Sequence, residues 1–192
     1  MIVGVLGLQG AVREHVDRLR HLEVPARIVK RLEDLEGLSG LILPGGESTT
    51  MTLLAEDGML NRLRALADRG LPMFGTCAGM ILLAHEAEGR ERPGIDAIDV
   101  TVSRNASGRQ VDSFETTLAV EGIGDDVPAV FIRAPYVTRL GDGVRALARH
   151  EGFVVMARQR AVLVASFHPE LTEDLRVHRY FIEEMVEKED GG

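Results

Sequence analysis

The feature that most constrains the fold is a regular alternation of short apolar runs with amphipathic segments in the first half of the chain. The apolar runs predict buried strands at residues 2–6, 26–30, 41–43 and 72–75. Apolar residues at helical spacing predict helices over residues 11–22, about 49–69, and 80–88. Strands that alternate with helices form a parallel sheet, because each helix crosses a face of the sheet before the next strand begins.

The second half has a different pattern, in which predicted strands follow one another with few helices between them. These strands are expected at residues 100–102, 114–120, 129–133, 144–148, 153–157 and 161–167. A helix marked by Leu175, His178, Ile182 and Met185 closes the chain. We therefore expect an α/β fold with three layers: a mostly parallel open sheet, helices on both faces, and an antiparallel extension. No linker or repeat interrupts the pattern, so residues 1–192 are expected to form a single domain.

The charge composition of the chain argues against two classes of binding partner, nucleic acid and anionic membranes. The chain has 22 basic and 30 acidic residues and a net charge of −8. Proteins that bind nucleic acid or anionic membranes usually carry excess positive charge, so neither partner is expected. The single cysteine permits no internal disulfide, which favours a reducing compartment, the cytoplasm. The N-terminus does not resemble a signal peptide, and no apolar run approaches the roughly 20 residues of a membrane span.

That cysteine stands in a specific context, Gly75-Thr76-Cys77-Ala78-Gly79, between a predicted strand and a predicted helix. This is the glycine-x-nucleophile-x-glycine pattern of a nucleophile elbow, a sharp turn at which bulky neighbours would clash. A helix N-terminus also favours a thiolate over a thiol. The pattern therefore predicts that Cys77 is a nucleophile, although a lone cysteine is often only a small buried hydrophobic residue.

A histidine and a glutamate follow the last predicted strand, as His168-Pro169-Glu170. The end of a parallel strand lies at the same edge of the sheet as the elbow, where open α/β sheets place their sites. Pro169 favours an extended chain, so Glu170 can orient one nitrogen of His168 while the other faces Cys77. The three residues are expected to form a catalytic triad.

A third loop, Pro44-Gly45-Gly46, ends a predicted strand at the same edge. Its glycines leave backbone N–H groups accessible, which can stabilise an oxyanion. We expect the oxyanion hole to combine the N–H groups of Gly46 and Ala78, the residue after the nucleophile. The other interpretation of the loop is a strand-to-helix turn capped by Ser48.

No pattern predicts a bound cofactor or a metal. The glycines at positions 4, 7 and 10 lack the spacing of a dinucleotide-binding loop, and the second strand ends in Lys30-Arg31, where an acidic residue would bind ribose. No P-loop lysine follows Gly45-Gly46, and no cysteine–histidine cluster has the spacing of metal ligands.

Together, the elbow, the His-Pro-Glu segment and the Pro-Gly-Gly loop resemble triad-type (class I) glutamine amidotransferases. Further segments resemble the glutaminase subunits of pyridoxal 5′-phosphate synthases. They lie at residues 5–11 (VLGLQGA), 43–50 (LPGGESTT), 104–105 with 108–115, 131–135, and 168–174 (HPELTED). The blocks LGLQGA and RQVDSFE point to this subfamily, whereas the triad pattern is shared by many amidotransferases.

The resemblance implies an enzyme that hydrolyses L-glutamine to L-glutamate and ammonia. It assigns Cys77 as nucleophile, His168 as acid and base, and Glu170 as its orienting partner. The implied glutamine-binding residues are Gly46, Glu47, Ser48, Arg104, Ile132 and Arg133. Either arginine can grip the α-carboxylate of glutamine or serve a subunit interface.

Three positions depart from the pattern of the family. Ala106-Ser107 stands where the family usually has Ser-Phe, and Tyr136 stands where it usually has His. These differences concern the packing around the glutamine pocket and the rim that faces the partner, and they leave the triad intact.

Three alternatives remain open to sequence alone. The chain could be a glutaminase subunit of another pathway, a different cysteine hydrolase, or a non-catalytic regulatory subunit that keeps the fold. The Pro-Gly-Gly loop and the His-Pro-Glu pairing weigh against the second, and an intact triad weighs against the third.

The resemblance also implies a partner, the synthase subunit that makes pyridoxal 5′-phosphate (vitamin B6) from a pentose phosphate and a triose phosphate. One domain leaves no second site to consume ammonia, so the hydrolysis is expected to depend on that partner. The expected gate is the loop Gly7-Leu8-Gln9-Gly10, where a peptide flip near Gln9-Gly10 would help complete the oxyanion hole when the partner binds. A tight turn that needs glycine explains the same residues equally well.

Overall fold

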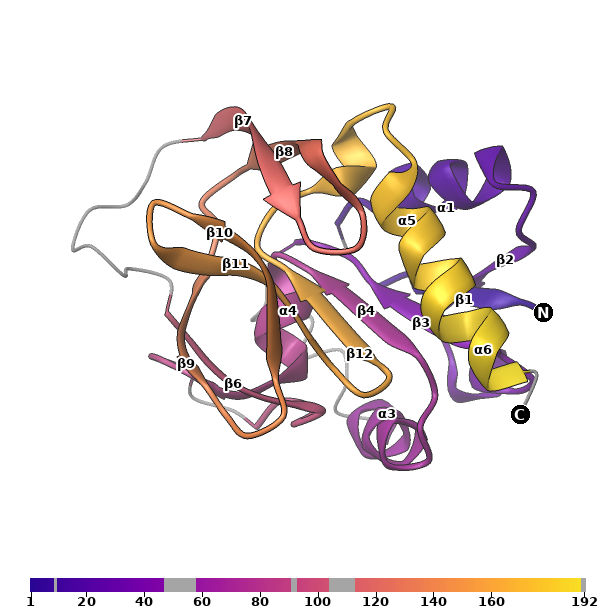
Figure 1. Ribbon diagram of the computed structural model, residues 1–192. Coiled ribbons are helices and arrows are strands. Elements are labelled where there is room, and N and C mark those ends of the chain that lie inside the picture. The colour runs from indigo at the N-terminus through magenta and orange to yellow at the C-terminus, as the bar shows by residue number, and fades with distance from the viewer. Residues whose placement is uncertain (9, 47–57, 91–92, 104–112, 191–192) are drawn as a thin grey trace.

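Ten strands form one sheet within residues 1–8, 10–46, 58–90, 93–103 and 113–190, which are the residues that the computed structural model describes (Figure 1). The strand order is β2-β1-β3-β4-β12-β11-β9-β6-β5, and β10 pairs with β11 outside this path. The first five strands of the order are parallel to one another: β2 (Ala26–Val29), β1 (Val3–Leu6), β3 (Gly40–Leu43), β4 (Met73–Thr76) and β12 (Val162–Ala165). They are the expected parallel part of the sheet.

The expected antiparallel extension begins at β11 (Phe153–Gln159), which pairs antiparallel with β12, β9 and β10. It continues through β9 (Tyr136–Leu140) and β6 (Ile98–Ser103) and ends in a parallel pair of β6 with β5 (Ala84–Ala87). The strand β10 spans Arg145–His150. A separate hairpin of β7 (Phe114–Val120) and β8 (Gly124–Phe131) lies beside the C-terminal helices (Figure 1).

Alternating side chains on the central strands supply two separate apolar cores. On β3, Leu41 and Leu43 enter one core and Ile42 enters the other. The first core includes α3 (Met59–Asp68) and α4 (Ala78–Leu83), and the second includes α1 (Val12–His21) and α5 (Arg176–Phe181). Because successive side chains point to opposite faces of a sheet, strands buried on both sides must be apolar throughout. The prediction of helices on both faces is confirmed.

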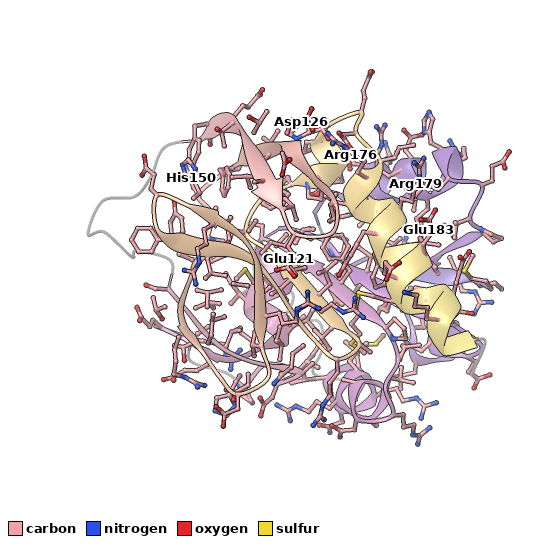
Figure 2. The ribbon with its side chains drawn as sticks, in the orientation of Figure 1. Glu121, Asp126, His150, Arg176, Arg179 and Glu183 are labelled. Atoms are coloured by element: carbon pink, nitrogen blue, oxygen red, sulfur yellow. The ribbon has the colours of Figure 1, made fainter. Side chains whose placement is uncertain are left out.

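Polar contacts join the hairpin to the main body. Arg176, at the start of α5, contacts Asp126 on β8 at 2.7 Å and also binds Asp174 (Figure 2). Arg145 on β10 forms an ion pair with Glu121, just after β7 (Figure 2). Exposed ion pairs contribute little free energy, so these contacts mainly set the orientation of the hairpin.

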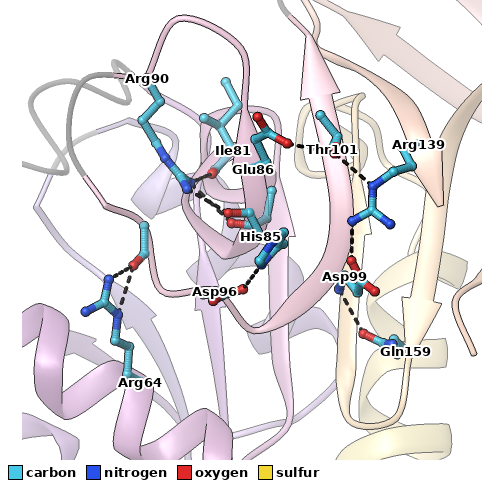
Figure 3. A network of polar contacts seen from close by, with 12 residues as sticks. Arg64, Ile81, His85, Glu86, Arg90, Asp96, Asp99, Thr101, Arg139 and Gln159 are labelled. Carbon is cyan, nitrogen blue, oxygen red and sulfur yellow. Dashed lines mark hydrogen bonds and ion pairs between the residues drawn. The ribbon is translucent and has the colours of Figure 1, made fainter. Parts of the chain in front are cut away.

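The prediction of a helix over residues 80–88 is wrong in its second half. The helix α4 ends at Leu83, and β5 follows at once and pairs with β6. Arg90 donates hydrogen bonds to the carbonyls of Ile81, Ala84 and His85 (Figure 3). These contacts satisfy carbonyls that the end of the helix leaves free.

Other elements were not expected from the sequence. They are β9, a 3-10 helix at Leu32–Leu35 (η1), and a second at Pro169–Leu171 (η2). The closing helix is confirmed, but α5 passes into a π-helical segment at Ile182–Val186 (η3) and a last turn at Glu187–Asp190 (α6). Among the described residues no helix is both long and apolar enough to cross a membrane.

Candidate active site

Cys77 occupies the predicted sharp turn between a strand and a helix. It follows β4, precedes α4, and has backbone angles of φ 48° and ψ −105°. Its N–H donates to the carbonyl of Ala165 on β12 at 2.8 Å. A non-glycine residue rarely adopts a positive φ, and such strain is often found at functional sites.

The glycines on either side are required by close backbone packing. A Cβ atom on Gly79 would lie 1.9 Å from the carbonyl oxygen of Leu43, and one on Gly75 would lie 2.6 Å from the backbone of Gly79. Real Cβ atoms do not approach other atoms so closely, so neither position accepts a side chain without movement of the main chain. The two glycines let the start of α4 pack directly against β3 and β4.

His168 and Glu170 lie at the same edge of the sheet, after β12. The Nδ1 atom of His168 is 2.7 Å from Oε1 of Glu170, and both side chains are buried. The backbone N–H of His168 donates to the carbonyl of Val130 on β8 at 2.8 Å, which fixes the start of the segment. Because a carboxylate only accepts hydrogen bonds, Nδ1 carries a proton and donates it to Glu170. The other ring nitrogen is left for Cys77.

Electrostatics favour a charged imidazole at this position. Burial lowers the pKa of His168, but hydrogen bonds with Cys77 and Glu170 and the charges of both groups raise it, with a net result of about 10. Both side chains border Gly45, which places the thiol near the imidazole. A protonated imidazole beside a sulfur atom is the arrangement that stabilises a thiolate nucleophile.

The loop after β3 lies against this pair. A Cβ atom on Gly45 would be 2.4 Å from Cε1 of His168 and 3.3 Å from Cβ of Cys77. The N–H of Gly45 donates to Oγ1 of Thr76 at 3.2 Å, and its carbonyl accepts a hydrogen bond from the N–H of Ala11 at 3.3 Å. Gly46 follows directly, and Ala78 begins α4 next to Cys77. The residues expected to form the oxyanion hole therefore flank the nucleophile and the histidine.

The structure also describes two residues that were expected to bind glutamine, Ile132 and Arg133. The carbonyl oxygen of Ile132, just after β8, lies 3.9 Å from Sγ of Cys77. Arg133 follows with a φ of 46° and an exposed side chain. The expected residues Gln9, Glu47, Ser48 and Arg104 lie outside the described residues, so their part in the site stays a prediction.

Sequence reasoning gave no role to a histidine that the structure buries next to Glu170. His15 on α1 is fully buried, with Nε2 at 3.5 Å from Oε2 of Glu170. His15 occupies a position on the apolar face of an amphipathic helix, so the sequence did indicate that it would be buried. A buried histidine needs polar partners, and this could have marked it as a functional candidate. Nothing in the spacing along α1 indicated which partners those would be.

A cysteine on a strand-to-helix elbow, facing a His–Glu pair at the end of a parallel strand, is the arrangement of a triad-type cysteine hydrolase on an α/β sheet. Residues 5–187 match the model of the SNO glutamine amidotransferase family. The chain belongs to this family.

Similar proteins agree with this family over nearly the whole chain. The pyridoxal 5′-phosphate synthase subunit PdxT of Bacillus cereus (strain B4264) is 55% identical over 186 residues, covering 96% of this chain and 95% of the relative. The protein of the same name from Bacillus cytotoxicus is 54% identical over 187 residues, covering 97% and 95%.

Solved structures give the same picture for the fold. A crystal structure described as a glutamine amidotransferase has a TM-score of 0.90 and 52% identity, covering 95% of this chain and 98% of that one. PurLQS from Thermotoga maritima has a TM-score of 0.73 over 95% of this chain and 97% of that one, but at 16% identity it supports the fold alone.

The packing of Gly45 leads to a first prediction. Gly45→Ala adds a methyl group where His168 and Cys77 leave no room, so His168 must move. A displacement of about 1 Å can cost about a hundredfold in rate, and we expect a loss of that order in glutamate release. Gly37→Ala is the control, because a Cβ atom there meets no atom within 4 Å. It should lose some stability through its φ of 70° and keep its turnover. Full activity in Gly45→Ala would show that the loop is not packed on the histidine.

The raised pKa of His168 leads to a second prediction. The folded protein holds the proton of His168 more tightly than the unfolded chain, where a histidine has a pKa of about 6.5. The resulting stabilisation is complete below about pH 6.5 and is lost as the pH rises through about 10. Urea unfolding of the wild type and of His168→Asn should therefore show a difference in unfolding free energy that is largest near pH 6 and shrinks toward pH 10. A difference that does not change with pH would contradict the charged imidazole.

Proposed function

We propose that this chain is the glutaminase subunit of a pyridoxal 5′-phosphate synthase, with Cys77, His168 and Glu170 as its catalytic triad. The observation that carries the proposal is the position of His168, which hydrogen-bonds Glu170 at 2.7 Å and also contacts Cys77. The family and its relatives at about 55% identity, which are subunits of pyridoxal 5′-phosphate synthase, indicate the substrate and the pathway.

The chemistry follows from this geometry. The thiolate of Cys77 attacks the side-chain amide carbon of glutamine, and a carbon–sulfur bond forms as the carbonyl oxygen becomes negative. The carbon–nitrogen bond then breaks, and the proton on His168 passes to the leaving nitrogen, so that ammonia departs and a thioester remains. Neutral His168 takes a proton from water, the resulting hydroxide attacks the thioester, and glutamate leaves as the thiolate of Cys77 is restored.

Two further groups of residues serve this reaction in the proposal. The N–H groups of Gly46 and Ala78 stabilise the negative oxygen of the tetrahedral intermediates. Glutamine is held by Gly46, Glu47, Ser48, Arg104, Ile132 and Arg133. One of the two arginines pairs with the α-carboxylate, because a guanidinium binds a carboxylate through two parallel hydrogen bonds.

The ammonia is passed to a synthase subunit, which uses it to build pyridoxal 5′-phosphate from a pentose phosphate and a triose phosphate. In the proposal residues 1–192 form one glutaminase domain, so the ammonia is consumed in the partner. Ammonia released into water near neutral pH would be protonated and no longer nucleophilic, which favours direct transfer between the subunits. The subunit requires no cofactor of its own, and a lone catalytic thiol fits a cytoplasmic location.

The loop before α1 is the proposed point at which the partner controls hydrolysis. Gly10 has a φ of 90°, and a Cβ atom there would lie 1.5 Å from the carbonyl oxygen of Gly45. Gly10 therefore packs against the glycine loop that carries Gly46. In the proposal, docking of the synthase subunit moves the Gln9-Gly10 peptide and completes the oxyanion hole.

Substitution of the triad tests the chemistry. Cys77→Ala should abolish glutamate release, and a glutamine-derived electrophile should label Cys77 in the wild type. His168→Asn should be almost as damaging, whereas Glu170→Gln keeps the shape of the orienting side chain and should lose only part of the activity. Because a triad acts as a unit, the double variant of His168 and Glu170 should be little worse than His168→Asn alone. Normal turnover in Cys77→Ala would refute the proposed mechanism.

The dependence on the partner is tested by glutamate release with and without the synthase subunit. We expect a clear stimulation of the wild type. Gly10→Val should respond much less, because a β-branched residue cannot easily adopt a φ of 90° and its side chain meets Gly45. Binding of the two subunits should be measured in parallel, so that a loss of docking is not mistaken for a loss of gating. Equal rates of the wild type in both conditions would refute the gate and leave the triad chemistry standing.

A further inference from the structure

Two histidines outside the triad lie in a line that ends at Glu170. His15 on α1 and His178 on α5 are both fully buried, although they are 163 positions apart in the chain. Nδ1 of His15 is 2.9 Å from Nε2 of His178. Nε2 of His15 is 3.2 Å from Oγ1 of Thr76 and 3.5 Å from Oε2 of Glu170. The line therefore crosses the second core from α5 through α1 to the triad.

The carboxylate of Glu170 has one oxygen that the triad does not use. Oε1 receives the hydrogen bond from His168, whereas Oε2 is buried and has no hydrogen-bond partner among the described residues at ordinary distance. A buried carboxylate oxygen without a donor costs free energy. Nε2 of His15 is the donor atom that the structure places next to it, slightly beyond the usual hydrogen-bond length.

The contacts select one tautomer for each ring. If Nε2 of His15 carries the proton, it donates toward Glu170 and Thr76, and Nδ1 accepts a hydrogen bond from the Nε2–H group of His178. Nδ1 of His178, which has no partner among the described residues, is then only an unused acceptor. The opposite assignment would bury an N–H without an acceptor and turn a lone pair of His15 toward a carboxylate. The first assignment avoids both penalties.

Both rings are neutral in the folded protein. Burial lowers the pKa of His15 well below its ordinary value, and electrostatic interactions with the neighbouring rings of His178 and His168 lower it further. Burial, with a contribution from Arg18, lowers the pKa of His178 to about 3. The groups facing His15 are thus Glu170 and Thr76 on one side, His178 on the other, and His168 behind Glu170. A neutral His15 adds no second positive charge beside Glu170 and contributes only a dipole.

We propose that His15 is a positioning residue of the glutaminase, which holds the free oxygen of Glu170 through its Nε2–H, and that His178 fixes the tautomer in which it does so. This inference rests on the function proposed above. With both of its oxygens held, Glu170 keeps His168 aligned with Cys77 throughout the two proton transfers.

The same ring also reaches the glycine loop. Oγ1 of Thr76, which His15 contacts, accepts the N–H of Gly45. His15 therefore touches both the orienting carboxylate and the hydroxyl that anchors the loop leading to Gly46. Since α1 begins just after Gly10 and Ala11, this helix joins the Gly10 turn to the carboxylate of Glu170 and to Thr76, which the side chain of His15 contacts.

The test compares three substitutions of His15 in the complex with the synthase subunit, using L-glutamine as substrate. His15→Gln places an amide nitrogen near the position of Nε2 and should keep at least half of kcat. His15→Asn carries the same amide but is too short to reach Glu170, and His15→Leu has no donor. Both should lose about tenfold in kcat with KM changed less than twofold, because the lost contact orients the triad and does not hold the substrate. His178→Leu should lose a smaller amount of kcat.

His21→Gln is the matched control, because His21 lies on the same helix with an exposed side chain that contacts only Asp17 in the described part of the chain. It should behave as the wild type. Wild-type kcat in His15→Leu, or equal kcat values in His15→Gln and His15→Asn at equal unfolding midpoints, would overturn the proposal. The comparison of kcat between His15→Gln and His15→Asn tests the proposal even if His15→Leu does not fold. A wild-type complex that releases no glutamate would instead refute the proposed function itself.

Discussion

The parallel pairing of β4 with β12 is the constraint on which the site depends. The two strands are far apart in the chain, yet their register sets Thr76 opposite Ala165, so both end at the same edge of the sheet. The N–H of Cys77 continues the ladder by donating to Ala165. Cys77 and His168 therefore emerge side by side from two rigid strands. A site built on strand ends keeps its geometry better than one built on free loops.

The three buried histidines around the site differ in charge: His168 is charged, whereas His15 and His178 are neutral. His168 is surrounded by Cys77 and Glu170, which favour its proton strongly enough to overcome burial. His15 and His178 lie a few ångströms deeper, and burial keeps both rings uncharged. Identical side chains thus take opposite charge states, because the hydrogen bonds and charges of Cys77 and Glu170 outweigh burial at His168, whereas burial prevails at His15 and His178. This separation leaves the charge where the reaction uses it.

Local sequence patterns predicted the helices and strands whose apolar periodicity follows from burial. The central strands and α1 were expected because their apolar periodicity is imposed by burial on both faces of the sheet or on one face of a helix. The helix over residues 80–88 was overextended because Ala84-His85-Glu86-Ala87 has ordinary helical residues, and only pairing with β6 makes it a strand. The strand β9 was missed because most of its pairing is to β6, from a distant part of the sequence.

The sequence by itself determined which residues carry the proposed chemistry: a cysteine between glycines, a His-Pro-Glu segment after a strand, and a glycine loop at a third strand end. These features can be recognised in the sequence because each depends on residues within a few positions of one another. Tertiary structure alone decided the contact of Gly45 with His168, the approach of Ile132 to Cys77, and the line from His178 through His15 to Glu170. Such contacts join side chains from different elements, and their distances are set by how helices and strands pack, which no local spacing encodes.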